Sequence, residues 1–393
     1  MNVVTDLIKI MKIKEERVIK KSIESQFFLG KAIILVGPRQ VGKTTLSENI
    51  VSGFEKAGKK VMKINCDNPT DRDLISDKDF EFLEKLIGSA DIIFIDEGQK
   101  VKTIGQTIKL LVDHYKDKKQ ILVTGSSSFN LLDKTQEALT GRKYVYKLYP
   151  LSFSELYPEK NLLKISKELE THLLYGNYPD VVNQKDFSSK RDVLEELSSS
   201  QLYKDILEFQ EIRNSDTIRN LLRALALQVG SEVSYTELSQ ILGIDKNTVE
   251  KYVDLLEKSF IVFRLPPYFS NKRNEIKKLK KIYFYDLGLR NSLIQNFNPL
   301  NLRNDTGHLW ENFLMVERMK KREYEKIYAN QYFWRTYDQK EIDLVEERDG
   351  KLFGYEFKWN TKKTPKAPKS WLETYKNATY EVITPDNYLD FIL

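Results

Sequence analysis

One short segment, Gly37 to Thr44, restricts the fold of this chain more than any other feature. Its sequence, Gly-Pro-Arg-Gln-Val-Gly-Lys-Thr, has the form G-x-x-x-x-G-K-T of a phosphate-binding P-loop. The apolar run Ala32–Val36 before it reads as a buried strand, and a helical pattern follows Lys43. Glycines let the backbone curl so that N–H groups face phosphate oxygens, and the helix N-terminus adds positive partial charge. The succession of strand, loop and helix therefore predicts a nucleoside-triphosphate site.

The residues of this loop have separate expected roles. The Lys43 ammonium is expected to reach the β- and γ-phosphates of ATP, and the Thr44 hydroxyl is expected to bind Mg²⁺. The segment predicted to bind ATP contains the whole loop and the residue after it: Gly37, Pro38, Arg39, Gln40, Val41, Gly42, Lys43, Thr44 and Thr45.

A second apolar strand ends in two carboxylates, Asp96 and Glu97, which is the Walker B pattern. Asp96 is predicted to hold Mg²⁺, and Glu97 to orient and deprotonate the attacking water as the catalytic base. A third strand, Ile121 to Gly125, ends at Ser126, whose hydroxyl could sense the γ-phosphate. Serine-rich loops are also ordinary after a strand, so both interpretations of Ser126 stay open.

Length and composition set limits on the kind of protein. A chain of 393 residues predicts two to four domains, and 41% hydrophobic with 31% charged residues is typical of a soluble globular protein. A net charge of +6 does not by itself indicate a nucleic-acid partner. The single cysteine, Cys66, excludes internal disulfides and favours a reducing cytoplasm. Lysines at 9, 12 and 14 interrupt the apolar N-terminus, and no apolar run approaches the ~18 residues of a membrane span, so we expect a cytoplasmic protein without membrane contact.

The pattern of apolar residues divides the chain. Strand candidates at 32–36, 61–65, 92–95, 121–124 and 144–148 alternate with amphipathic helices, which predicts an α/β domain with a parallel sheet. The expected order is a helical lead-in (1–30), a P-loop ATPase core (31–155), a helical lid (156–230), a winged helix-turn-helix (231–295) and a C-terminal α/β domain (300–393).

Several further motifs complete a family resemblance that spans nearly the whole chain. They are Leu139-Thr140-Gly141-Arg142, Tyr149-Pro150-Leu151-Ser152-Phe153-Ser154-Glu155, Tyr175-Gly176-Asn177-Tyr178-Pro179 and Tyr283-Phe284-Tyr285-Asp286-Leu287-Gly288-Leu289. Together with the P-loop and the Asp96-Glu97 pair, they resemble a group of bacterial and archaeal AAA+-type ATPases with an uncharacterised C-terminal region. The resemblance implies that Arg142 contacts nucleotide, in the same subunit or across a homo-oligomer interface. The alternative is a surface arginine in a turn.

Residues 234–259 read as two helices separated by a turn at Gly243-Ile244, which is the helix-turn-helix pattern. Strands at 260–265 and 281–285 would form a wing, and the segment between them is basic: Lys272, Arg273, Lys277, Lys278, Lys280 and Lys281. A basic wing beside a helix that begins Lys246-Asn247-Thr248 suits DNA contact. Winged helices also serve as packing or protein-binding modules, so DNA is the expected partner but not the only one.

The C-terminal region contains a candidate nuclease site. A helix carries Glu311, a strand carries Asp343, and a later strand carries Glu356 and Lys358, which share a strand face because they are two residues apart. This ordered set resembles the PD-(D/E)xK nuclease core, with Glu-Ile-Asp where a fuller motif has Pro-Asp. The resemblance implies that Asp343 and Glu356 bind Mg²⁺ or Mn²⁺ with help from Glu311. Lys358 would then stabilise the transition state as a catalytic residue.

Two hypotheses follow from these features. In the first, ATP hydrolysis in the P-loop domain is combined with DNA binding by the winged helix and Mg²⁺-dependent cleavage by the C-terminal domain. In the second, the protein is an ATP-gated switch whose winged helix and nuclease-like fold only bind DNA or a protein partner.

Overall fold

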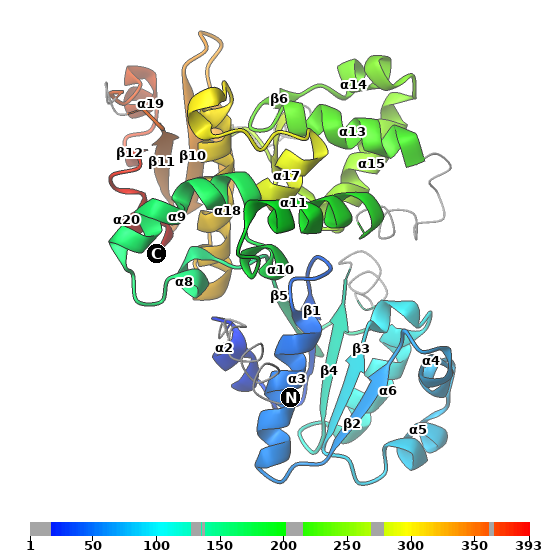
Figure 1. Ribbon diagram of the computed structural model, residues 1–393. Helices are drawn as coiled ribbons and strands as arrows, with labels where there is room; N and C mark the ends of the chain where they lie inside the picture. The colour runs from blue at the N-terminus through cyan, green and yellow to red at the C-terminus, as the bar shows by residue number, and fades with distance from the viewer. Residues whose placement is uncertain (1–16, 127–134, 136–137, 202–214, 269–278, 361–364) are drawn as a thin grey trace, which may run out of the picture. The chain divides into compact units, whose positions relative to one another are not determined.

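The computed structural model describes residues 17–126, 135, 138–201, 215–268, 279–360 and 365–393. They form two compact units (Figure 1). Unit 1 extends to Pro150 and includes residues 258–260, and unit 2 contains residues 151–257 and 261–393. Within the described ranges, no helix combines the length and the apolar character needed to cross a lipid bilayer.

Unit 1 is built on a five-stranded parallel sheet with the order β2-β3-β4-β1-β5. Its strands are β1 (Ala32–Val36), β2 (Val61–Asn65), β3 (Ile92–Asp96), β4 (Gln120–Gly125) and β5 (Lys143–Lys147). Its helices are α2 (Lys20–Glu24), α3 (Lys43–Lys56), α4 (Pro69–Ile75), α5 (Phe80–Ile87), η1 (Gly98–Lys100) and α6 (Ile104–Tyr115). The five predicted strands and the parallel sheet are confirmed.

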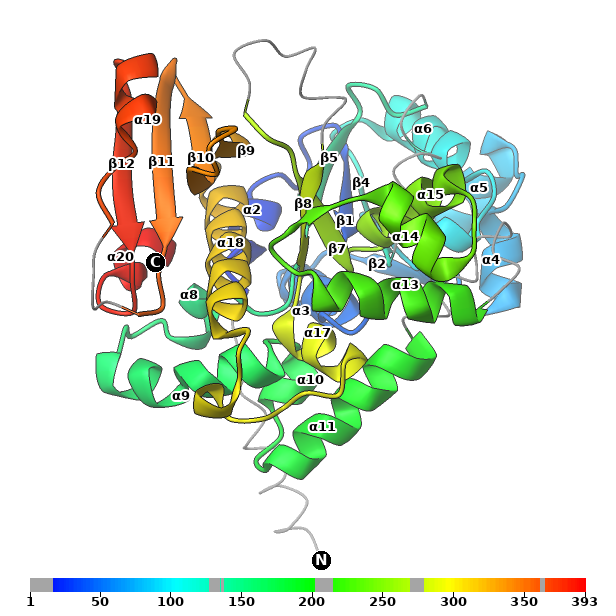
Figure 2. The ribbon, with the colours of Figure 1, turned by 90° about the horizontal axis from the view of Figure 1, so that it is seen from above.

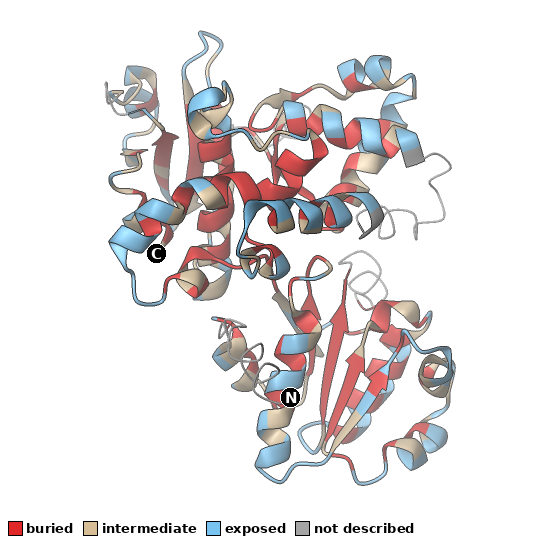
Figure 3. Ribbon diagram, viewed as in Figure 1, coloured by how far each residue is buried: buried red, intermediate tan, exposed pale blue. Residues whose placement is uncertain are grey.

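The central strands are covered on both faces. Every residue of β1 and β4 is buried, as the red ribbons of Figure 3 show, and such continuous apolar strands are typical of parallel sheets flanked by helices. Strand β4 lies between β1 and β3, and all three are parallel, so the loops that follow them leave the same edge of the sheet side by side. The fold therefore brings together the P-loop, the Asp96-Glu97 pair and the end of β4.

The middle of unit 2 contains a helix-turn-helix packed on a small sheet. It runs through α13 (Ser215–Leu227), β6 (Glu232–Val233), α14 (Tyr235–Leu242), α15 (Lys246–Lys258), β7 (Val262–Leu265) and β8 (Lys280–Phe284). The three strands form an antiparallel sheet with the order β6-β8-β7. The Ser234 hydroxyl caps α14, and Gly243 ends it with φ +65°, a left-handed conformation that favours glycine. The two predicted helices therefore correspond to α14 and α15.

The C-terminal part of unit 2 is a four-stranded sheet beside one long helix, α18 (Thr306–Glu325) (Figure 2). The sheet order is β12-β11-β10-β9, with β11 parallel to β12 and antiparallel to β10. Its elements are β9 (Asn330–Arg335), β10 (Glu341–Arg348), β11 (Lys351–Phe357), α19 (Lys369–Thr374), β12 (Ala378–Ile383) and α20 (Tyr388–Ile392). Helix α18 lies on the face of this sheet and contributes Trp310, Phe313 and Leu314 to the largest core of unit 2.

The region predicted as a helical lid does not form a separate body. It contains α8 (Phe153–Leu156), α9 (Leu162–Tyr175), α10 (Pro179–Val182), α11 (Phe187–Glu196) and the π-helical turn η2 (Leu197–Gln201). These helices belong to unit 2, where α9 packs on α17 (Leu287–Leu293) and shares the core of α18. The described helices of residues 156–230 are thus part of unit 2, and their role as a lid stays a prediction.

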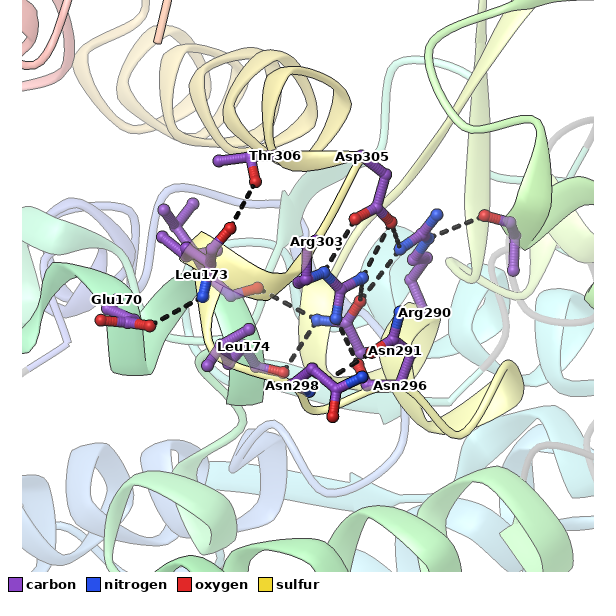
Figure 4. Close-up of polar contacts among 12 residues, drawn as sticks. Glu170, Leu173, Leu174, Arg290, Asn291, Asn296, Asn298, Arg303, Asp305 and Thr306 are labelled. Atoms are coloured by element: carbon purple, nitrogen blue, oxygen red, sulfur yellow. Dashed lines mark hydrogen bonds and ion pairs between the residues drawn. The ribbon is translucent and has the colours of Figure 1, made fainter. Parts of the chain in front are cut away.

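Two buried arginines fasten α17 to its neighbours (Figure 4). Arg290 and Arg303 share the carboxylate of Asp305, with contacts of 2.6 and 2.8 Å. Arg290 also donates to the Ala226 carbonyl of α13, and the Asn291 amide donates to the Leu173 and Leu174 carbonyls at the end of α9. The charge-assisted arginine contacts and the neutral Asn291 amide together join α9, α13 and α17 near the loop that precedes α18.

Candidate functional site

The P-loop has a backbone that glycine makes possible. Gly42 has φ +89°, which ordinary side chains rarely adopt, and a Cβ added at Gly37 would lie 2.0 Å from the Leu148 carbonyl oxygen. Lys43 is 5% exposed, and its ammonium donates to the Gly37 and Pro38 carbonyls at 2.9 and 2.7 Å. The loop therefore curls around the lysine head group, with α3 beginning directly behind it.

A hydroxyl and a carboxylate with the chemistry of magnesium ligands lie beside the loop. The Thr44 hydroxyl is 3.1 Å from both carboxylate oxygens of Asp96, and Thr124 at the end of β4 also contacts that carboxylate. A hydroxyl and a carboxylate at the start of a helix are hard oxygen donors, the kind that Mg²⁺ prefers. The residues present therefore fit Mg²⁺ bound together with a nucleotide triphosphate.

Glu97 is held by a residue that sequence reasoning missed. Gln99 is 4% exposed, and its amide donates to the Glu97 carboxylate at 2.5 Å and to the Ser126 hydroxyl at 2.9 Å. The Glu97 backbone N–H donates to Thr124 at 3.2 Å. The expected base and the expected γ-phosphate sensor are thus joined through one amide. A glutamine three positions after Asp96, just beyond a Walker B strand, was the available signal.

Arg17, just before α2, also contacts the P-loop region. It is 8% exposed and donates to the Val41 carbonyl at 2.7 Å and to the Tyr149 carbonyl at 2.6 Å. One guanidinium therefore ties the loop to the chain that follows β5. The lead-in segment gave no sequence signal for this contact, because a single arginine among lysines and glutamates reads as solvated.

Arg142 lies away from the P-loop. It precedes β5, and its carbonyl accepts from the Ala32 N–H at the start of β1, whereas the P-loop leaves the opposite end of β1. Its guanidinium pairs with Asp113 of α6 at 2.5 Å. The geometry does not bring Arg142 to the nucleotide site of its own subunit. The predicted contact across a subunit interface therefore stays a prediction.

Three other residues of the predicted ATP-binding segment lie at the surface of the P-loop: Gln40 and Thr45 are exposed, and Arg39 is half-buried.

In the C-terminal sheet, Asp343 and Glu356 face each other. The paired residues of β10 and β11 end at Leu344 and Tyr355, and one more step of the same antiparallel register would set Asp343 opposite Glu356. The Phe357 N–H donates to Asp343 Oδ2 at 2.8 Å, which places the Asp343 carboxylate beside this end of β11. Directly opposite residues share one face of the sheet. The register of β10 against β9 shifts between Ile342 and Val345, and such bulges often re-aim a side chain at a site.

These two carboxylates are buried close to other carboxylates, and both have raised pKa values. Burial raises the pKa of Asp343 above its usual range, and neighbouring Glu311 adds to the rise. Burial also raises the pKa of Glu356, with Asp343 as the next cause. Lys358, directly after β11, contacts Glu356 Oε1 at 2.5 Å, while Glu356 Oε2 is buried and makes no hydrogen bond to the described residues. An orphaned oxygen beside a second carboxylate fits a divalent cation held by Asp343 and Glu356.

Glu311 reaches the same region, but its carboxylate is already engaged. Glu311 Oε1 accepts from Lys281 at 3.0 Å and from the Tyr283 hydroxyl at 2.7 Å. Within the described ranges, no group of three His, Cys, Asp or Glu side chains is arranged to hold a metal ion. The predicted role of Glu311 as a third metal ligand is therefore not supported by this arrangement.

The burial of Lys281 contradicts the prediction that this residue belongs to a solvent-facing basic wing. Lys281 is 3% exposed and lies among Glu311, Glu341 and Asp343, so it cannot serve as a free contact for DNA phosphates. Lys280, its neighbour on β8, is half-buried. The remaining basic residues of the predicted wing, Lys272, Arg273, Lys277 and Lys278, lie outside the described residues.

Comparison with known families divides the chain into three matched segments. Residues 29–157 match a family described as an AAA domain, and this segment contains the P-loop and the Asp96-Glu97 strand. Residues 166–300 and 306–388 match two domains of unknown function, DUF8612 and DUF4143. The P-loop and the Asp96-Glu97 strand therefore lie in a segment that is similar to AAA domains, and two regions whose families carry no assigned activity follow it.

Relatives that align with most of the chain occur in bacteria and archaea. An uncharacterised protein of Mycobacterium tuberculosis is 26% identical over 91% of this chain and 77% of its own length. An uncharacterised protein of Methanocaldococcus jannaschii is 25% identical over 77% of this chain and 70% of its own. A solved structure of the replication initiator DnaA bound to AMPPCP and single-stranded DNA is 16% identical, covers 64% of this chain and 91% of its own, and has a TM-score of 0.34. AMPPCP-bound DnaA from Aquifex aeolicus is 17% identical over 61% and 86%, with a TM-score of 0.30.

Proposed function

We propose that unit 1 hydrolyses ATP with Mg²⁺. The observation that carries this proposal is the contact of Thr44 with Asp96 beside the buried ammonium of Lys43. Lys43 exchanges its bonds to loop carbonyls for the phosphate oxygens, and Thr44 and Asp96 hold Mg²⁺. Bound Mg²⁺ supplies positive charge to the β- and γ-phosphates. Glu97, aimed by Gln99, accepts the proton of the attacking water.

Paired variants test this proposal. Lys43→Ala should abolish tight ATP binding, because the charge that contacts the β- and γ-phosphates is lost. Glu97→Gln should keep ATP binding and lower turnover by about 100-fold or more, because the base is lost while the Mg²⁺ ligands remain. Binding is measured with a fluorescent ATP analogue and turnover by phosphate release. Wild-type turnover by Glu97→Gln would reject Glu97 as the base.

Unit 2 suggests a second activity, metal-dependent cleavage of phosphodiester bonds. It is supported by Glu356 Oε2, which is buried without a hydrogen bond opposite Asp343. Asp343 and Glu356 would hold Mg²⁺ or Mn²⁺, and Lys358, partly exposed beside Glu356, would stabilise the charge that develops on the phosphate. A bound divalent ion would activate the attacking water.

The cleavage proposal is tested with plasmid DNA, Mn²⁺ or Mg²⁺, and ATP. Asp343→Ala should remove metal-dependent nicking and leave ATP hydrolysis intact, because the two sites bind separate ions. Lys358→Ala should remove nicking while metal binding persists. If neither wild-type protein nor the Glu97→Gln variant nicks DNA under any of these conditions, the alternative gains support. In that alternative, unit 2 only binds DNA or a protein partner under the control of ATP.

DNA is the proposed partner of the α14–α15 region. Helix α15 begins with Lys246 and Asn247 exposed at its N-terminus and carries exposed Lys251, an arrangement that suits entry into a major groove. Neutralising Lys272, Arg273, Lys277 and Lys278, with Lys281 left intact, should reduce the salt dependence of DNA binding. The expected change in slope is up to ~0.9 per lost phosphate contact. An unchanged slope would place the DNA contact elsewhere.

A homo-oligomer is the arrangement in which Arg142 could reach a nucleotide. Its pairing with Asp113 at 2.5 Å would have to open, or rearrange, at the interface. If this is its role, Arg142→Ala should lower turnover only at protein concentrations where the wild-type chain self-associates. Equal loss of activity in the monomeric range would assign Arg142 a structural role.

A further inference from the structure

Four carboxylates of unit 2, those of Glu311, Glu341, Asp343 and Glu356, form an acidic cluster. This cluster contains the side-chain ammonium of Lys281. Lys281 and Tyr283 are two residues apart on β8, so their side chains project from the same face of that strand. Both reach Glu311 on α18, through contacts of 3.0 and 2.7 Å to the same carboxylate oxygen. The strand that completes the helix-turn-helix module thus places a positive charge in the C-terminal site.

The Lys281 ammonium has three carboxylates around it. It contacts Glu341, lies 3.0 Å from Glu311 and lies 3.7 Å from Asp343 Oδ1. The ring of Phe333 covers it at 5.5 Å, and the residue is only 3% exposed. An ammonium has three donors and no acceptor, so it can satisfy several carboxylates at once. This is the position that a cation shared by Glu311, Glu341 and Asp343 would occupy.

The other side of the cluster is organised differently. Glu356 is 9% exposed, and its Oε2 makes no hydrogen bond to the described residues. Asp343 Oδ2 accepts from the Phe357 N–H at 2.8 Å, while Oδ1 is 3.7 Å from Lys281, beyond hydrogen-bond distance. One oxygen of each carboxylate is therefore available for a cation. The four carboxylates lie against Lys281, Lys358 and the Arg335 guanidinium, whose Nε is 3.8 Å from Glu341, so the cluster keeps an excess of negative charge that favours a bound cation.

We propose that Lys281 is a resident cation that fills the second cation position of the C-terminal site, so that this site binds a single divalent ion at Asp343 and Glu356. The inference rests on the metal site proposed above, and it adds the number of divalent ions that this site binds. Asp343 lies between the two positions, since it faces both Lys281 and Glu356. Lys281 is a positioning residue in this account, because its direct contacts with Glu311 and Glu341 keep these two carboxylates from binding a second ion.

The test counts Mn²⁺ ions per chain by the electron paramagnetic resonance signal of free Mn²⁺. The full chain carries Asp96→Asn in every sample, which disables the magnesium pair of unit 1, and nucleotide is omitted. This parent should bind one Mn²⁺. Adding Lys281→Gln should raise the number to two, because Glu311, Glu341 and Asp343 then face one another without the ammonium that lies between them. Lys280→Gln, the same change on the neighbouring residue of β8, should leave the number at one.

The outcomes separate the two proposals. No Mn²⁺ in the parent, or one that survives Glu356→Gln combined with Asp343→Asn, would reject the metal site itself. Two Mn²⁺ in the parent, or one in Lys281→Gln, would reject the role of Lys281 and leave the metal site standing. If Lys281→Gln does not fold in chelator, Mn²⁺ should restore its folding, as followed by circular dichroism. Failure of Mn²⁺ to restore it would show that a divalent ion cannot take the place of the ammonium.

Discussion

Glu97 adopts a left-handed backbone conformation with φ 53°, which costs an ordinary residue roughly 1 to 3 kcal/mol and is frequent at functional sites. This conformation turns the backbone sharply after β3. The Glu97 carboxylate then accepts from the Gln99 amide, which also donates to Ser126. Sequence reasoning predicted Asp96 and Glu97 because their position after an apolar strand is distinctive. It missed Gln99, because the Walker B pattern covers only the two carboxylates and assigns no role to the glutamine three positions after Asp96.

Gln99→Ala should lower the turnover of ATP by roughly 10-fold while nucleotide affinity stays unchanged, because the general base loses its positioning contact but not its chemistry. The measurement is kcat from phosphate release beside the affinity for a fluorescent ATP analogue. Gln106→Ala, an exposed glutamine on α6, is the matched control and should have wild-type kcat. Unchanged turnover in Gln99→Ala would mean that Glu97 is aimed by other contacts.

His172 predicts a pH dependence of the stability of unit 2. It is buried, with Nδ1 2.7 Å from the Asn177 side-chain oxygen and Nε2 beside the Tyr157 hydroxyl, and Glu168, Lys190 and Lys320 are the nearby charges. Burial lowers the pKa of His172 from 6.5 to about 4. Below pH 6.5 the unfolded chain therefore binds a proton that the folded chain refuses, and stability falls as pH decreases toward 4.

The contribution of this histidine is isolated by difference. Between pH 6.5 and 4, wild-type protein should lose up to roughly 3 kcal/mol of unfolding free energy relative to His172→Gln, at about 1.4 kcal/mol per pH unit. Urea unfolding at several pH values measures this. Parallel curves for wild type and His172→Gln would contradict the prediction.

At the scale of elements, two motifs of the family resemblance prove to be two sides of one contact. The end of α9, at Tyr175-Gly176-Asn177, meets the start of α17, at Asp286-Leu287-Gly288. Asp286 accepts from the Asn177 N–H at 2.7 Å and caps α17 through the Leu289 N–H at 3.0 Å. Close approach explains both glycines, because a Cβ at Gly288 would lie 2.0 Å from the Tyr175 carbonyl and one at Gly176 would lie 2.1 Å from Asp286.

Gly288→Ala should destabilise unit 2 by about 3 kcal/mol or more, since a backbone carbonyl cannot move aside as a flexible side chain can. Gly307→Ala in α18 is the matched control, because a Cβ there meets nothing within 4 Å. The control should stay within about 1 kcal/mol of wild type, as expected from helix propensity. Urea unfolding provides the comparison, and equal stability of the two variants would disprove the packing argument.

The elements that sequence could predict are those whose pattern is local. The strands of unit 1 are continuous apolar runs, and helices α14 and α15 have a capping serine and a turn glycine. Strand β12, Ala378–Ile383, was missed because it is an edge strand with exposed and half-buried residues. The burial of Lys281 was missed because it depends on acidic residues from α18 and β10 that lie far away in sequence.

At the scale of the whole molecule, the chain leaves unit 1 at Pro150 and is anchored in unit 2 within three residues. The Leu151 carbonyl accepts from Lys320 at 3.0 Å, and the Phe153 N–H donates to Glu317 at 2.8 Å. Glu317 and Lys320 pair at 2.8 Å and are each about 2% exposed. Both belong to α18, the helix that also carries Glu311. One helix therefore holds the connecting segment and contributes to the acidic cluster.

This arrangement predicts the consequence of breaking the buried pair. Glu317→Ala should destabilise unit 2 by roughly 3 to 5 kcal/mol, because it leaves the Lys320 ammonium buried without its carboxylate partner. The double variant Glu317→Leu, Lys320→Met should lose less, since neither charge remains to be solvated. Urea unfolding measures both, and Glu325→Ala at the exposed end of α18 is the control. ATP affinity should be the same in all of these variants, because the nucleotide site is built within unit 1. A weaker ATP affinity in Glu317→Ala would instead show that the anchor on α18 influences the P-loop, and would make the connecting segment a route of communication.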